Sequence, residues 1–291
     1  MDIFNFIKKG LMRYLFMKVE VFILTHKEIN ETYDDKLYKP LLTGAVFKEN
    51  KYGFLTDDTG DNISNLNDYY GELSGEYWAW KNTMNDIIGF THRRRWFVKN
   101  YKFDKITQED IIDSLKTHDI ILPPKFNRRK SLYEFQKEAD IKLPDYDVEY
   151  EDYLRVENVL RKYYPDYGEA YNKTMNGNIL YAKNMFICNR ELADKYFEWL
   201  FDVLEKLMDE IDLKKYENRD KRIFGFISER LLTTFVLKNN LKVKEYDLYS
   251  NEAFIPYVVF IEHHCPLLRE FIYKITPFMI KFFKKIGIYK S

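Results

Sequence analysis

Short hydrophobic runs alternate with longer stretches of mixed polarity from residue 19 to residue 246. Runs rich in β-branched and aromatic residues predict strands over residues 19–24, 86–90, 119–122, 180–188 and 242–246. The stretches between them predict helices over residues 72–82, 107–117, 150–163, 165–176, 190–209 and 223–239. Thr107 and Asp110 match a capping box at the start of the second helix. Strands that alternate with helices are expected of an α/β domain, in which helices cover the faces of a sheet.

Polar side chains follow the first two predicted strands, at the sheet edge where open α/β domains bind ligands. These side chains are Thr25, His26 and Lys27 after the first strand and His92, Arg93, Arg94 and Arg95 after the second. Three arginines and a histidine suit an anionic ligand such as a diphosphate, because a guanidinium can pair bidentately with phosphate oxygens. The alternative is a solvated loop, or a basic run paired with acidic side chains elsewhere.

A loop rich in turn-forming residues separates the first strand from the first helix. It contains Asp57, Asp58, Asp61 and Asn62. The carboxylates could hold a hard divalent cation such as Mn²⁺ or Mg²⁺, but they could equally accept hydrogen bonds from their own turns. The spacing does not match an EF-hand, so no metal is assigned.

Two tryptophans on the helix predicted over residues 72–82 are candidates for stacking on a sugar or a base. They are Trp78 and Trp80, followed by Lys81. The alternative is that they belong to the core. Because residues this close in sequence do not share one helix face, we expect Trp78 and Trp80 to divide between core and cleft.

Glu229 is the candidate general base on the helix predicted over residues 223–239. A carboxylate near a helix start can receive a proton from a sugar hydroxyl if it faces the cleft. The alternative is an ion pair with Arg230 or Arg222.

Composition favours one α/β domain: 291 residues with 46% hydrophobic side chains can bury one good-sized core. The two cysteines, Cys188 and Cys265, form neither a disulfide framework nor a CxxC motif, which fits a reducing cytoplasm. The formal net charge is zero, but setting aside ten basic and two acidic side chains at the two ends leaves 36 basic and 44 acidic between them. This middle of net charge −8 disfavours nucleic acid as a partner.

The two ends are basic and amphipathic, and they suggest three parts: residues 1–18, a domain over 19–262 and a tail over 263–291. Apolar residues recur every three or four positions in the tail, with lysines between them, as in a helix that lies in the headgroup layer of an anionic membrane. The alternative is a terminal helix packed on the domain. No apolar run approaches the roughly 20 residues needed to span a bilayer. We therefore expect a cytoplasmic protein, peripheral on the inner face of the plasma membrane.

Eight short motifs occur together in a characteristic order. They are T-H-K (25–27), G-F-L-T-D-D-T-G-D-N-I-S (53–64), E-L-S-G-E-Y-W-A-W-K-N (72–82), I-G-F-T-H-R-R-R-W-F (88–97), D-I-I-L-P (119–123), N-M-F-I (184–187), W-L-F-D (199–202) and R-I-F-G-F-I-S-E-R-L-L (222–232). This set resembles the DUF4422 family of capsular and exopolysaccharide synthesis clusters, which is regarded as glycosyltransferase-like. The resemblance implies a GT-A-like single domain with a mixed, mainly parallel central sheet flanked by helices.

The GT-A resemblance also implies roles for single residues. In place of the D-x-D motif that usually holds Mn²⁺, this chain has the basic run that starts at His92, which puts metal dependence in doubt because arginines can neutralise a leaving diphosphate. Thr25–Lys27, Asp57, Asp61, Asn62 and His92–Arg95 would bind the donor. Trp78, Trp80, Lys81, Asn184 and Arg230 would contact the sugar or acceptor. If the transfer inverts the anomeric centre, Glu229 or a carboxylate of the 57–61 loop, Asp58, would act as base; a retaining transfer requires none.

The resemblance implies transfer of a hexose, galactose in pyranose or furanose form, from a nucleotide diphosphate donor such as a UDP-sugar to a lipid-linked glycan. A second hypothesis is an accessory protein that binds a nucleotide or glycan without turnover. A third is a sugar-phosphate transferase, which would release a nucleoside monophosphate.

Overall fold

The computed structural model describes residues 17–100, 103–142, 148–216 and 221–250. The predicted C-terminal tail, and all of the predicted N-terminal segment except its last two residues, lie outside this part of the chain.

A mixed sheet runs through the described part, with strand order β10-β6-β9-β4-β1-β2-β3 and with β5 joining β4 to β11. Its strands are β1 (Val19–Thr25), β2 (Tyr38–Leu42), β3 (Leu55–Thr56), β4 (Ile87–His92), β5 (Arg95–Val98), β6 (Ile120–Leu122), β9 (Ile187–Asn189), β10 (Val243–Glu245) and β11 (Asp247–Ser250). The neighbours β4, β1, β2 and β3 are parallel, whereas β9 runs antiparallel to both β4 and β6. Two short strands, β7 (Phe126–Asn127) and β8 (Ile179–Leu180), pair separately.

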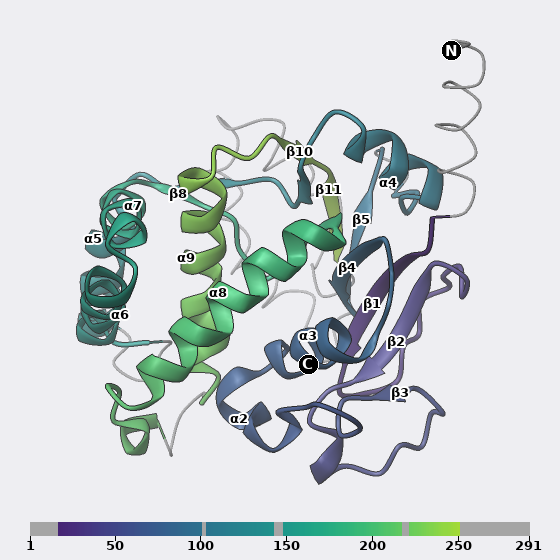
Figure 1. The fold of residues 1–291 in the computed structure, drawn as a ribbon, viewed down its shortest axis with the longest axis horizontal. Coiled ribbons are helices and arrows are strands. Elements are labelled where there is room, and N and C mark those ends of the chain that lie inside the picture. Colours follow the sequence, from purple (N-terminus) through teal and green to yellow (C-terminus); the bar gives the residue numbers. More distant parts are fainter. Residues whose placement is uncertain (1–16, 101–102, 143–147, 217–220, 251–291) are drawn as a thin grey trace, which may run out of the picture.

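Helices cover both faces of this sheet (Figure 1). They are α2 (Asn67–Tyr70), α3 (Leu73–Asn82), α4 (Gln108–Leu115), α5 (Leu132–Lys142), α6 (Tyr150–Tyr163), α7 (Pro165–Asn176), α8 (Arg190–Met208) and α9 (Ile223–Lys238). Helices α5, α6 and α7 gather at the end of the molecule far from β1, and α8 and α9 lie between them and the sheet (Figure 1). The structure confirms the predicted α/β fold, a mixed, mainly parallel central sheet flanked by helices.

The sequence of β1 is almost wholly apolar because both of its faces are buried. Phe22 and Leu24 belong to the core on the α3 and α8 side, whereas Val21 and Ile23 belong to the core on the α4 side. A parallel strand covered on both faces reads as a continuous hydrophobic run rather than an alternating one. Helix α4 begins with the predicted capping box, in which Thr107 and Asp110 each bond to the other's backbone N–H.

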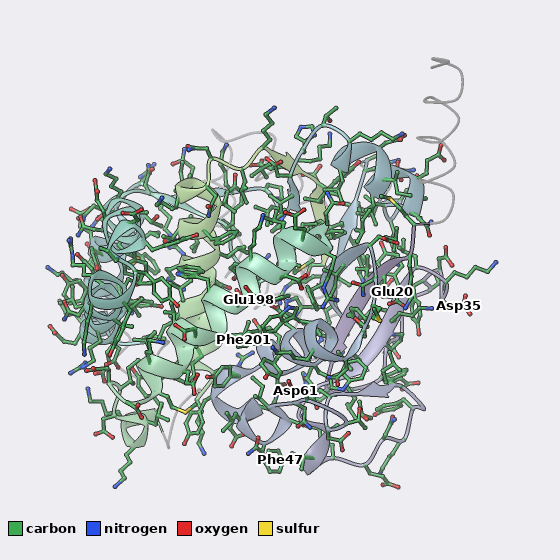
Figure 2. The ribbon with its side chains drawn as sticks, viewed as in Figure 1. Glu20, Asp35, Phe47, Asp61, Glu198 and Phe201 are labelled. Atoms are coloured by element: carbon green, nitrogen blue, oxygen red, sulfur yellow. The ribbon has the colours of Figure 1, made fainter. Side chains whose placement is uncertain are left out.

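Two expectations about local structure were wrong. The strand predicted over residues 180–188 is two strands, β8 and β9, separated by a turn in which Lys183 and Asn184 have φ angles of 80° and 50°. Trp78 and Trp80 do not divide between core and cleft, because only 8% and 7% of their surface is exposed. Helix α3 is buried on both sides. Phe201, labelled in Figure 2, lies on α8 and stacks on Trp80 of α3.

Candidate active site

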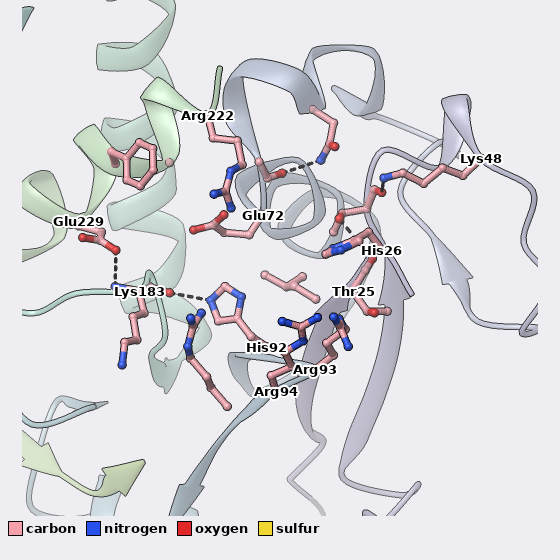
Figure 3. A pocket seen from close by; sticks show the side chains of 17 residues that line it. Thr25, His26, Lys48, Glu72, His92, Arg93, Arg94, Lys183, Arg222 and Glu229 are labelled. Atoms are coloured by element: carbon pink, nitrogen blue, oxygen red, sulfur yellow. Dashed lines mark hydrogen bonds between the residues drawn. The ribbon is translucent and has the colours of Figure 1, made fainter. Parts of the chain in front are cut away.

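A cavity of about 470 Å³ opens at the carboxyl ends of three parallel strands. Thr25 ends β1, Thr43 follows β2 and His92 ends β4, and all three line the cavity. Figure 3 shows Thr25 and His92 at this edge. The parallel pairing of β1 with β2 and β4 brings these strand ends to one sheet edge. The predicted edge site and this cavity therefore coincide at Thr25 and His92, and also at His26 and the three arginines that follow His92.

The opposite wall comes from helix starts and from the turn before β9. Glu72 stands directly before α3, Arg222 directly before α9, and Gly225, Phe226 and Glu229 lie on the first turns of α9. Figure 3 shows Glu72, Arg222 and Glu229 across the cavity from Arg93 and Arg94. The cavity thus lies between the sheet edge and the start of α9.

Positive charge dominates the lining. The Lys and Arg side chains of the lining are Lys48, Arg93, Arg94, Arg95, Lys183 and Arg222, against the carboxylates of Glu72 and Glu229. Burial, with Arg93 as the strongest charged neighbour, lowers the pKa of His26 to about 4. The pKa of His92 is also lowered, because burial outweighs the opposing effect of Glu72. Both imidazoles are therefore neutral at pH 7, and the six cations suit a ligand with multiple negative charges.

The turn at Lys183 and Asn184 is fixed from several sides. Glu229 Oε1 accepts a hydrogen bond from the Lys183 backbone N–H at 2.6 Å, and His92 Nε2 lies 2.7 Å from the Lys183 carbonyl oxygen. Asn184 Nδ2 donates to Glu72 Oε1 at 2.9 Å and to the carbonyl of Gly225 at 2.8 Å. Left-handed φ angles at two successive non-glycine residues are strained, and such strain persists only where the surroundings over-determine it.

Asp57, predicted to bind the donor, is buried away from the cavity lining. Its carboxylate accepts bonds from the backbone N–H groups of Gly44 and Ala45, both at 2.9 Å, and from the hydroxyls of Ser64 and Ser74, both at 2.6 Å. The loop that follows β2 and the start of α3 are thereby tied to one carboxylate. Asp57 therefore holds the loop and the helix together and does not face the cavity.

Other predicted residues also lie off the cavity lining. Asp58 is exposed, Asp61 accepts from the Tyr77 hydroxyl at 3.0 Å, and Asn62 accepts from the backbone of Ser64. The Thr25 hydroxyl accepts from the Lys27 backbone N–H at 3.0 Å, which shapes the turn after β1 and leaves the Lys27 side chain exposed.

The predicted acceptor-binding residues lie behind the cavity walls or outside them. Trp78 donates its indole N–H to Thr59, and Trp80 donates to Asp194, each at 2.9 Å. The ammonium of Lys81 lies 3.7 Å from the Trp80 ring centre. Asn184 is buried, and Arg230, also buried, donates to the Phe226 carbonyl at 3.0 Å. None of these five residues lines the cavity, although Asn184 and Arg230 bond to residues that do.

Four charged lining residues were missed by the sequence interpretation: Lys48, Glu72, Lys183 and Arg222. Lys48 follows β2, a strand that was not predicted, and its ammonium donates to the Thr43 carbonyl at 2.6 Å. Glu72 is the first residue of one predicted helix and Arg222 directly precedes another, and the N-termini of helices commonly bind anionic ligands. That position was the available signal.

Within the described residues, no three His, Cys, Asp or Glu side chains are grouped so that they could hold a metal ion. No helix in the same part of the chain is long and apolar enough to cross a membrane.

Comparisons with known proteins agree with this fold. The family model of DUF4422, a domain of unknown function, matches residues 20–240, well over half of the chain. The chain belongs to the DUF4422 family. Its fold is similar to the apo structure of WbbM, a bifunctional glycosyltransferase, with a TM-score of 0.70 and 29% sequence identity over 79% of this chain. The match covers 45% of the WbbM chain, so this DUF4422 protein corresponds to less than half of that structure. No curated protein matches the chain.

Proposed function

We propose that this DUF4422 protein is a glycosyltransferase that uses a nucleotide diphosphate sugar as donor and a glycan as acceptor. The observation that carries the proposal is the set of cationic side chains at the ends of β1, β2 and β4. Such side chains stabilise the charge that develops on a diphosphate leaving group. The similarity in fold to a bifunctional glycosyltransferase supports this reaction class.

The two walls of the cavity suggest where each substrate binds. The nucleotide and diphosphate would lie on the sheet edge, against Thr25, His26, Arg93 and Arg94. The acceptor would enter along the start of α9, where Phe226 offers an apolar ring surface for a sugar. The anomeric carbon would then lie between the two walls.

The finer identity of the substrates is also a proposal. The resemblance to surface-polysaccharide enzymes favours a UDP-sugar donor, galactose in pyranose or furanose form as the hexose, and a lipid-linked glycan acceptor. A panel of nucleotide sugars should identify the donor by thermal stabilisation, because a ligand that binds only the folded state raises its stability.

Product analysis separates the three reaction classes. Release of a nucleoside diphosphate only when acceptor is present is expected of a glycosyltransferase. A non-catalytic accessory protein would be stabilised by the ligand but release nothing, and a sugar-phosphate transferase would release a nucleoside monophosphate. Either of these results would contradict the proposal.

We also propose that the protein acts on the inner face of the plasma membrane, held by its basic ends. The support is the spacing of apolar residues and lysines over residues 266–291. Sedimentation with anionic liposomes should recover the full chain in the pellet and leave a chain ending at Cys265 in the supernatant. Equal recovery of both in the supernatant at low salt would rule out the tail as an anchor.

A further inference from the structure

Two carboxylates line the cavity, Glu72 and Glu229, and they differ in how they are bonded. Both are within reach of the space between the two walls (Figure 3). Their hydrogen bonds show which one is available to take a proton from a substrate.

The carboxylate of Glu229 is already committed to the protein. Oε1 accepts the backbone N–H of Lys183 at 2.6 Å, and Oε2 lies 3.5 Å from Nη1 of Arg230. The first bond stabilises a strained turn, and the second balances the charge of a buried arginine. Protonation of Glu229 would weaken both interactions in every catalytic cycle. Its bonding therefore suits a positioning residue.

The carboxylate of Glu72 is held at one oxygen. Oε1 accepts Nδ2 of Asn184 at 2.9 Å, and no other hydrogen bond to this carboxylate forms within the described residues. A β-carbon placed on Gly225 would lie 3.6 Å from Oε2 and 3.7 Å from Oε1, so the carboxylate rests against this glycine. Figure 3 shows the carboxylate directed between Arg222 and His92.

Glu72 lies close to several sources of positive charge. It immediately precedes α3, where the positive end of the helix dipole stabilises a carboxylate. Arg222 and Lys183 add positive charge from the same cavity lining, which also contains Glu229. Glu76, one turn along α3, is fully buried, and burial together with Glu72 raises its pKa well above 4.5. Glu76 does not line the cavity and so does not compete for the proton.

We infer that Glu72 is the general base of a sugar transfer that inverts the anomeric carbon. This inference rests on the proposed function. The acceptor hydroxyl oxygen attacks the anomeric carbon, and its proton passes to Oε2 of Glu72. The bond from the anomeric carbon to the diphosphate oxygen breaks, and its electron pair leaves with the diphosphate beside Arg93 and Arg94. Glu72 then returns the proton to solvent.

The neutral imidazole of His92 fits this role for Glu72. Its Nε2 lies 2.7 Å from the Lys183 carbonyl oxygen, which can only accept, so Nε2 carries the proton. The ring is thereby fixed beside Glu72 without forming a permanent cation that would hold the carboxylate in an ion pair. His92 acts as a positioning residue for the turn that also orients Asn184.

The test combines a variant pair with product stereochemistry. Glu72→Gln should lower kcat by about 100-fold or more while the donor Kd changes less than about threefold, because general bases contribute on the order of 10²–10⁴. The matched control Glu229→Gln should lower the melting temperature more and kcat less. Independently of any variant, NMR of the first product formed by the unaltered protein should show the anomeric configuration opposite to that of the donor.

The outcomes separate the two levels of the proposal. A product that retains the donor configuration, or a folded Glu72→Gln protein with kcat within threefold of the unaltered one, overturns the inference and leaves the glycosyltransferase proposal standing. If the unaltered protein transfers sugar from no donor to any glycan acceptor, both fail.

Discussion

The backbone N–H of Lys183 donates to the carboxylate of Glu229 across 46 residues of sequence. The bond ties the turn between β8 and β9 to α9, so that the two halves of one cavity wall keep a fixed spacing. Lys183 has a φ of 80°, a value that favours glycine, yet a cationic side chain occupies this position and lines the cavity. The chain therefore accepts backbone strain where it places a charge in the cavity lining.

The first prediction measures that strain. Lys183→Gly keeps the backbone groups that bond to Glu229 and His92 and adopts the left-handed conformation without cost. Lys183→Ala removes the same side chain but keeps the steric penalty. Glycine should therefore be more stable than alanine by about 1–2 kcal/mol in urea unfolding. Equal stabilities of the two variants would show that the turn is not strained.

The second prediction concerns the diphosphate. Replacing Arg93 and Arg94 by alanine should weaken binding of the UDP-sugar at least about tenfold, because a charge-assisted hydrogen bond contributes about 1.5–3 kcal/mol. Isothermal titration calorimetry measures the affinity. The matched control removes two exposed lysines of α7 and α8, Lys173 and Lys195, and should leave the affinity unchanged. An unaltered Kd in the arginine variant would exclude this role.

The third prediction is weak dependence on divalent metal ions. Six Lys and Arg side chains line the cavity where a metal would otherwise neutralise the leaving diphosphate. Treatment with EDTA should therefore lower the transfer rate by less than about twofold, as followed by release of nucleoside diphosphate. Loss of activity on chelation that Mn²⁺ restores would contradict this, and the exposed Asp58 and Asp61 would then be the first ligands to replace.

Local sequence signals located β1, β4, β6, β10 and most of the helices, but they missed the shorter strands β2, β3, β5, β7 and β11 and helix α5. The roles of side chains depended on distant partners. The capping box of Thr107 and Asp110 closes within one turn and was predictable. Asp57 was predicted to bind a ligand because its neighbours form a polar loop. Its carboxylate instead accepts a hydrogen bond from the hydroxyl of Ser74, 17 residues later. Only the packed fold brings that hydroxyl to the carboxylate.

The candidate site was predictable where it depends on strand ends and not where it depends on packing. A hydrophobic strand followed by a polar run identified Thr25, His26 and the arginines after His92 from sequence alone. The prediction that Trp78 and Trp80 divide between core and cleft was wrong because it assumed a helix with one solvent-exposed side. Helix α3 is covered on both sides. Arg222 reaches the cavity only because α9 begins beside Gly71, where an added β-carbon would come 3.1 Å from Arg222 Cδ.

The fourth prediction separates the two neighbouring aspartates of the loop. Asp57→Asn replaces a buried acceptor of four hydrogen bonds with an amide that brings its own donors, and should lower the free energy of unfolding by about 2–4 kcal/mol. Asp58→Asn alters an exposed side chain and should change it by about 0.5 kcal/mol or less. Urea unfolding of both variants measures the difference. Equal effects would mean that the Asp57 cluster does not stabilise the fold.

The fifth prediction follows from Glu76, whose carboxylate is fully buried in α3 and makes no hydrogen bond within the described residues. Burial raises its pKa well above 4.5, so the folded protein keeps a proton there that the unfolded chain loses above that pH. The folded state then binds more protons than the unfolded state, and this residue's contribution to stability falls as pH rises.

Glu76→Gln removes the titration and keeps the side-chain size. The stability of the variant relative to the unaltered protein should therefore increase by about 1.4 kcal/mol for each pH unit above 4.5, until the pKa of Glu76 in the folded state is reached. Urea unfolding of both proteins at pH 5 and pH 8 measures this, because titrations common to both cancel in the difference. A difference that does not change with pH would mean that Glu76 is ionised in the folded protein, and a partner for its charge would then have to exist beside α3.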